Sequence, residues 1–127
     1  MPQPFFKGKF MDSKNIKILF FGDLVGKPGR FAVRDFLAEN KNNYDFIIAN
    51  VENASHGFGL TEKNYKEISE YGVDCMTSGN HIWDKKEIFN YISGAEKLIR
   101  PFNYPADTIG QGSHVFEFED GLKIAVI

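Results

Sequence analysis

Acidic, amide and imidazole side chains follow three apolar runs of this sequence, and they are its best candidates for chemistry. Asp23 ends the first run, Glu52-Asn53 ends the second, and Asn80-His81 lies just beyond the third. Carboxylate and amide oxygens suit hard divalent cations, and imidazole suits transition metals. Open α/β sheets place their sites at the carboxyl ends of parallel strands, so we expect these residues to meet at one sheet edge. The pattern predicts a metal site.

Each of these residues also has a simpler structural interpretation. Asp23 could cap the loop that follows it, and spacing alone does not separate this role from metal binding. Glu52 shifts the balance, because a buried, unpaired carboxylate is costly and needs a cation or strong donors nearby. His81 alone would be an ordinary structural histidine, but beside two other polar strand ends it is better interpreted as a ligand or proton donor. His56 could contact substrate, although a solvated loop histidine is the simpler interpretation.

The elements that position these residues alternate along the chain. Three apolar runs predict buried parallel strands: Ile16–Phe21, Phe46–Val51 and Val73–Thr77. Between them, residues 30–39 have helical periodicity, and Thr61 and Gly72 are a suitable cap and stop for a second helix. Asp84 is expected to cap a third helix that ends at residues 93–94. The resulting βαβαβα order favours an α/β fold with right-handed parallel connections.

The last part of the chain has a different pattern. Residues 100–112 contain two prolines and two glycines and predict a loop. Two apolar segments, Val115–Glu119 and Leu122–Ile127, flank Asp120-Gly121, a dipeptide that favours a type I′ hairpin turn. The chain stops inside the second of these segments without a turn or polar tail, so we expect a truncated domain. Residues 1–14 are interpreted as an N-terminal extension.

Composition excludes several classes of protein. The chain has 127 residues, 43% of them hydrophobic, which is enough for one folded domain. A formal charge of −2 gives no basic footprint for long nucleic acid. Cys75 is the only cysteine, so no intrachain disulfide can form, and no apolar stretch reaches the ~18 residues of a membrane span. Gly22–Lys27 is one residue too short for a phosphate-binding loop. A cytoplasmic protein is expected.

Five ordered segments resemble one family of enzymes. They are Gly22–Arg30, Asn50–Ala54, Gly57–Thr61, Gly79–Asp84 and Arg100–Pro105. Together they resemble the YmdB-like metallophosphoesterases of the calcineurin-like superfamily, a family associated with hydrolysis of 2′,3′-cyclic nucleotides. The resemblance runs over residues 15–127 and covers the N-terminal part of a metallophosphoesterase domain. It implies an α/β fold that is the N-terminal half of a four-layer α/β/β/α sandwich, followed here by the hairpin.

The resemblance also implies roles for individual residues. Asp23 would bind one metal ion, Glu52 would bridge two, Asn53 would join the first ion and Asn80 the second. The two ions are expected to be iron or manganese. A hydroxide that bridges them would attack the phosphorus of a 2′,3′-cyclic nucleotide, and His81 would protonate the departing ribose oxygen to give a 3′-nucleotide.

One departure from the family pattern leaves an alternative open. The family supplies further metal-binding histidines from a later segment, and nothing after His81 provides a matching pair; His114 does not match those positions. The alternative is therefore a non-catalytic nucleotide-binding or regulatory module without stable metals. The partners expected are a small cyclic nucleotide and a second copy of the chain, which one uncovered sheet face would allow; neither long nucleic acid nor membrane is expected.

Overall fold

The computed structural model describes residues 15–127, and the N-terminal extension of residues 1–14 lies outside them. The strands are β1 (Ile18–Asp23), β2 (Phe46–Asn50), β3 (Cys75–Thr77), β4 (His114–Glu117) and β5 (Lys123–Val126). The α-helices are α1 (Gly26–Asn40), α2 (Glu62–Glu70) and α3 (Ile88–Tyr91). Short 3₁₀ helices are η1 (Lys41–Asn43), η2 (Asn80–Asp84) and η3 (Ile92–Gly94). The expected α/β order is confirmed.

Strands β1, β2 and β3 form a parallel sheet in that order. Its register aligns the strand ends, because Asp23 pairs with Asn50 and Asn50 pairs with Thr77. The register of β1 shifts between Phe21 and Asp23, so Gly22 is an extra residue at a bulge. Bulges of this kind redirect the side chain that follows them. The sheet thus presents Asp23 at the edge where β2 and β3 also end.

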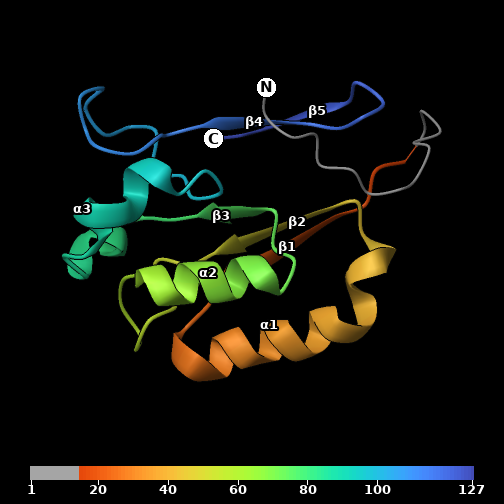
Figure 1. The fold of residues 1–127 in the computed structure, drawn as a ribbon, viewed down its shortest axis with the longest axis horizontal. Helices are drawn as coiled ribbons and strands as arrows, with labels where there is room; N and C mark the ends of the chain where they lie inside the picture. Colours follow the sequence, from red (N-terminus) through yellow and green to blue (C-terminus); the bar gives the residue numbers. More distant parts are fainter. Residues whose placement is uncertain (1–14) are drawn as a thin grey trace.

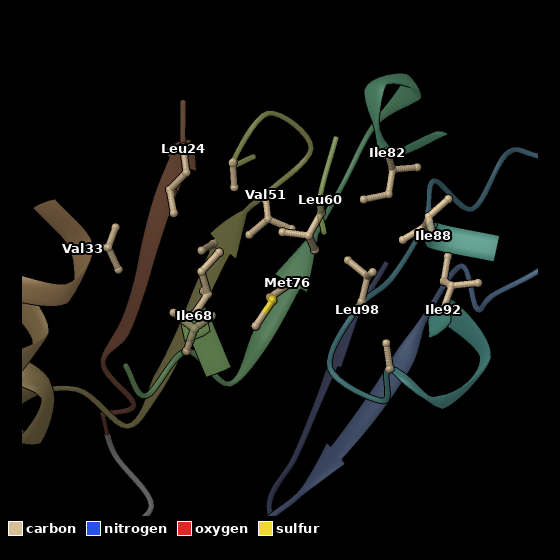
Figure 2. Close-up of a cluster of buried hydrophobic side chains, with 14 of the residues drawn as sticks. Leu24, Val33, Val51, Leu60, Ile68, Met76, Ile82, Ile88, Ile92 and Leu98 are labelled. Carbon is tan, nitrogen blue, oxygen red and sulfur yellow. The ribbon is translucent and has the colours of Figure 1, made fainter. Parts of the chain in front are cut away.

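Helices α1 and α2 cover one face of this sheet (Figure 1). Helix α1 buries Val33 and Leu37, whose spacing places them on one side of the helix. Helix α2 begins at the cap expected from the sequence, where the Thr61 hydroxyl accepts a hydrogen bond from the Asn64 N–H at 3.1 Å. One continuous core extends from α1 and α2 along the sheet to α3 and η3 (Figure 2). It includes Leu24, Val33, Val51, Leu60, Ile68, Met76, Ile82, Ile88, Ile92 and Leu98.

The β4–β5 hairpin lies against the other face of the sheet (Figure 1). Phe116 and Phe118 pack on Phe46, with ring centroids 5.0 and 6.1 Å apart, respectively. This second core covers β2 and β3 but not β1, whose Ile18 and Phe20 remain 50% and 57% exposed. The sheet face that we expected to be uncovered is therefore only partly open, because the hairpin folds over two of its three strands.

The third helix differs from its prediction. Helix α3 is only four residues long, and Asp84 does not cap it. Asp84 instead ends η2, and the extended backbone of Lys85 (φ −97°, ψ 108°) separates it from the helix. The Asp84 carboxylate is hydrogen-bonded to His81, so it is not available as a cap. The prediction failed because a polar partner three residues away competes with the helix terminus for the same carboxylate.

The hairpin turn also differs from the type I′ turn that Asp120-Gly121 suggested. A type I′ turn needs positive φ at both central residues, but of the two only Gly121 has it, at 87°. The Gly121 N–H donates to the Phe118 carbonyl at 3.0 Å, and the Phe118 N–H donates to the Leu122 carbonyl at 2.8 Å. These bonds define a three-residue loop with glycine in the left-handed position, the next most common hairpin connection.

No helix in the part of the chain that the structure describes is long and apolar enough to cross a membrane.

Candidate functional site

The carboxyl edge of the sheet gathers most of the residues singled out from the sequence. Asp23 is the last residue of β1, Glu52 and Asn53 follow β2, and Asn80 and His81 open η2 after β3. Backbone hydrogen bonds join the segments just beyond the strands, since the Leu24 N–H donates to the Asn50 carbonyl and the Val51 N–H to the Thr77 carbonyl. The chain therefore crosses this edge three times in fixed register. The expectation of one common edge is confirmed.

Asp23 and Asn53 form the first half of the site. The Asn53 Nδ2 donates to both oxygens of the Asp23 carboxylate, at 3.0 and 3.2 Å. The Asn53 backbone carbonyl accepts from the Gly26 N–H at 2.9 Å, which fixes the start of α1 against the same loop. In this arrangement the amide nitrogen, not the ligating oxygen, faces Asp23. Asn53 must rotate its amide group for both residues to share a cation.

Glu52 forms the second half, across from η2. Its Oε2 accepts from the backbone N–H of His81 at 3.1 Å. A Cβ at Gly79 would lie 2.5 Å from both carboxylate oxygens of Glu52, so any other residue there would force the Glu52 carboxylate to move. Steric crowding by Glu52 therefore explains why glycine suits position 79. Glu52 lies between the β2 loop and the turn after β3, as a shared ligand would need to.

His81 is held by Asp84, a partner that the sequence interpretation missed. His81 Nδ1 and Asp84 Oδ2 are 2.7 Å apart. The hydrogen bond to Asp84 raises the pKa of His81, and the negative charges of Asp84, Glu52 and Asp23 raise it further. The spacing His81-x-x-Asp84 places both side chains on one turn of a helix, and this was the signal available in the sequence. A raised pKa and a fixed ring orientation suit a proton donor.

Asn80 and His56 are placed less directly. Asn80 is the first residue of η2, between Gly79 and His81, the two residues that contact Glu52. His56 is exposed in the loop after β2 and has a positive φ of 57°, which is uncommon for a residue with a side chain. The structure brings His56 into the loop that carries Glu52 and Asn53, but among the described residues the His56 ring forms no hydrogen bond or ion pair with those side chains.

That loop rests on a buried polar network that sequence analysis also missed. The Ser55 hydroxyl accepts from the Thr61 N–H at 2.9 Å and donates to Asn64 Oδ1 at 2.6 Å. Arg30 Nη1 donates to the Ala54 carbonyl at 2.6 Å, and its Nε lies 3.3 Å from Glu67 Oε2. Arg30 is 9% exposed. The network ties α1 and α2 to the two residues that follow Asn53, so it fixes the backbone beneath the candidate ligands.

The donor set matches part of a metal centre. Two carboxylates, Asp23 and Glu52, and the amides of Asn53 and Asn80 supply oxygen donors at one edge. Among residues 15–127, no three His, Cys, Asp or Glu side chains are grouped closely enough to hold an ion. A metal ion at this edge would therefore be held by carboxylate and amide oxygens and would need further donors from water or from elsewhere.

Comparison with known proteins identifies the family. The chain matches the family described as "YmdB-like protein" over residues 19–127. It belongs to the YmdB-like family. A Bacillus subtilis (strain 168) relative named 2′,3′-cyclic-nucleotide 2′-phosphodiesterase is 46% identical over 114 residues, which is 88% of this chain and 43% of that protein. This chain thus spans less than half the length of that YmdB-like relative.

Two solved structures of similar sequence share the fold. One is a hypothetical protein from Thermus thermophilus, with a TM-score of 0.80 and 38% identity, covering 87% of this chain and 43% of that one. The other is a phosphatase of Mycoplasma pneumoniae, with a TM-score of 0.74 and 39% identity, covering 84% of this chain and 40% of that one. This chain therefore shares its mixed α/β fold with a parallel sheet with both structures.

Proposed function

We propose that this chain is the N-terminal part of a dinuclear metal-dependent phosphodiesterase that hydrolyses 2′,3′-cyclic nucleotides to 3′-nucleotides. The observation that carries the proposal is the meeting of Asp23, Asn53, Glu52 and the His81–Asp84 pair at one sheet edge. The name of the Bacillus subtilis relative supports the substrate class. We also propose that the hairpin begins the second sheet of a four-layer sandwich in the complete domain.

The residues at this edge would have two roles, metal binding and proton donation. Asp23 and Asn53 would hold one cation and Asn80 the other, with Glu52 shared between them; iron or manganese suits such a set. When bound, the two cations would activate the attacking water and offset negative charge on the phosphoryl oxygens. Asp84 contacts His81 at Nδ1, which leaves Nε2 free to face the substrate; in the charged imidazolium form, Nε2–H would give its proton to the 2′-oxygen as its bond to phosphorus breaks. The phosphate stays on the 3′-oxygen.

The direct test replaces the proton donor. We expect His81→Ala to retain most bound metal and to lose roughly 10²- to 10⁴-fold in turnover, the usual range for a general acid. His114→Ala is the matched control, since His114 lies in the hairpin against Phe116. Turnover of 2′,3′-cyclic AMP is followed by phosphorus NMR in the chain joined to the remaining part of the Bacillus subtilis relative. The ribose 2′-oxygen is a poor leaving group that needs a proton. Unchanged turnover in His81→Ala would therefore show that His81 is not the general acid.

A second function is favoured by one observation. Because no three His, Cys, Asp or Glu side chains gather for a metal within the described residues, the site could bind a nucleotide without stable metals. The chain would then be a binding or regulatory module. Metal content separates the two functions: near-stoichiometric binding of two transition-metal ions supports the enzyme, and no binding at micromolar metal supports the module.

A further inference from the structure

Phe58 is an exposed aromatic side chain on the same loop as Glu52 and Asn53. It is 47% exposed, and Lys85 Nζ lies 4.1 Å from the centre of its ring. Single exposed apolar residues are ordinary on protein surfaces and need no explanation alone. Phe58 differs because the chain around it is held in an uncommon conformation and because it contacts Lys85, the residue after Asp84.

The loop that carries Phe58 is constrained from both ends. His56, Gly57 and Gly59 all have positive φ, at 57°, 91° and 75°. A non-glycine residue in this region is uncommon and persists where the surroundings impose it. The Phe58 N–H donates to the Ser55 carbonyl at 3.2 Å, and the Ser55 N–H donates to the Gly59 carbonyl at 3.0 Å. These constraints fix the backbone on both sides of an exposed ring.

The loop also makes close contact with the segment after His81. A Cβ at Gly59 would lie 2.5 Å from Lys85 Cγ and 3.0 Å from its backbone nitrogen. Glycine at this position therefore lets the loop reach Lys85, which places the ammonium over Phe58. The same two segments carry the site: the Gly59 N–H donates to the Glu52 carbonyl at 2.5 Å, and Lys85 directly follows Asp84.

We infer that Phe58 and Lys85 form the base-binding part of the site, where Phe58 stacks on the nucleobase of the substrate. This inference rests on the proposed function. A flat, uncharged aromatic ligand suits an exposed aromatic ring, and stacking of this kind tolerates different bases because every base has a π-face. Lys85 holds the ring from one side through a cation–π contact and leaves its other face for the base. Phe58 is thus a residue that binds the base of the substrate, whichever base it is, and is separate from the residues that perform the chemistry.

The test compares two ligands that differ only in the base. The 127-residue chain is titrated with 2′,3′-cyclic AMP and with ribose 2,3-cyclic phosphate, which lacks a base, and Kd is read from NMR shifts. We expect Phe58→Leu to weaken binding of the nucleotide about tenfold, as loss of one stacking contact implies, and to leave the base-free ligand unchanged. Phe58→Trp should keep or tighten nucleotide binding. The ring protons of Phe58 should shift with adenine and not with the base-free ligand.

Phe36→Leu is the matched control. Phe36 is a similarly exposed aromatic residue, at 39%, but it packs with Tyr44 beside the amino end of β2. The Phe36→Leu substitution should leave the Kd of both the nucleotide and the base-free ligand unchanged. Equal Kd values for the nucleotide in the Phe58→Leu variant and the original chain would overturn the inference, as would an equal loss for both ligands. Binding of both ligands with equal Kd by the original chain, or binding of neither, overturns the inference about Phe58. Failure of the proposed function is distinguished by the His81→Ala turnover assay in the joined protein.

Discussion

At the scale of single residues, the contact between His81 and Asp84 predicts how the protonation of His81, and the stability linked to it, change with pH. The hydrogen bond and charge of Asp84 favour the charged imidazolium, so they raise the pKa of His81. Asp84→Asn removes that charge and should lower the pKa, which reduces the protonated fraction near neutral pH. Because the pKa of His81 is higher in the folded state, protonation of His81 stabilises the fold. This stabilisation is fully present below the unfolded-state pKa of about 6.5 and is lost as pH rises through the folded-state pKa.

NMR titration of the His81 ring protons in the metal-free chain measures this shift. Asp107→Asn is the control, because Asp107 is an exposed loop carboxylate distant in sequence from His81. An unchanged His81 midpoint in the Asp84→Asn variant would show that the 2.7 Å contact does not govern this titration.

The carboxylates Asp23 and Glu52 should differ in their effect on metal binding. Glu52→Gln removes the charge of the ligand proposed to serve both ions, so we expect it to weaken binding of both. Asp23→Asn should affect mainly one ion, because the Asp23 carboxylate contacts the Asn53 side of the site. Manganese titration by calorimetry measures both, with Asp107→Asn as the control. Equal and negligible losses in the two variants would contradict the assignment.

At the scale of elements, the Arg30–Glu67 pair joins α1 to α2. The side chains are only 11% and 25% exposed. Loss of one partner leaves the other charge poorly solvated, so Arg30→Met should reduce the free energy of unfolding by about 3 kcal/mol. Arg34→Met is the matched control: the Arg34–Asp35 pair on the same helix is 44% and 68% exposed, so its loss should reduce the free energy of unfolding much less. Urea denaturation measures both, and equal losses would contradict the role of Arg30.

The helices and strands also show which features of the fold could be predicted from the sequence. Apolar runs and caps predicted the order of strands and helices, because burial of a strand and the Thr61 cap are local consequences of residue type. The strand-end rule predicted that Asp23, Glu52 and His81 share an edge. The sequence did not reveal the Asp84–His81 contact or the Arg30 network, because each depends on a choice between competing partners that only packing decides.

At the scale of the whole molecule, the chain spans 43% of the Bacillus subtilis relative. The proposed protein donors at the sheet edge are few for two cations, so affinity should be weak. We expect the 127-residue chain alone to have little activity on 2′,3′-cyclic AMP, and joining it to the remaining part of that relative to raise metal occupancy and turnover together. Assays of both proteins with added manganese, after thermal unfolding confirms that each is folded, provide the test. Comparable turnover from both would contradict this expectation.

The bare face of β1 has a practical consequence for handling the protein in solution. Ile18 and Phe20 are 50% and 57% exposed on a strand at the margin of its sheet, where unpaired backbone groups also invite a neighbouring chain. Concentrated samples should therefore turn turbid sooner than dilute ones. Phe20→Lys should delay turbidity, because a charge on an edge strand discourages chain-to-chain pairing. Light scattering measured against protein concentration gives the concentration at which turbidity begins. The same concentration for Phe20→Lys and the original chain would mean that self-association does not use this face.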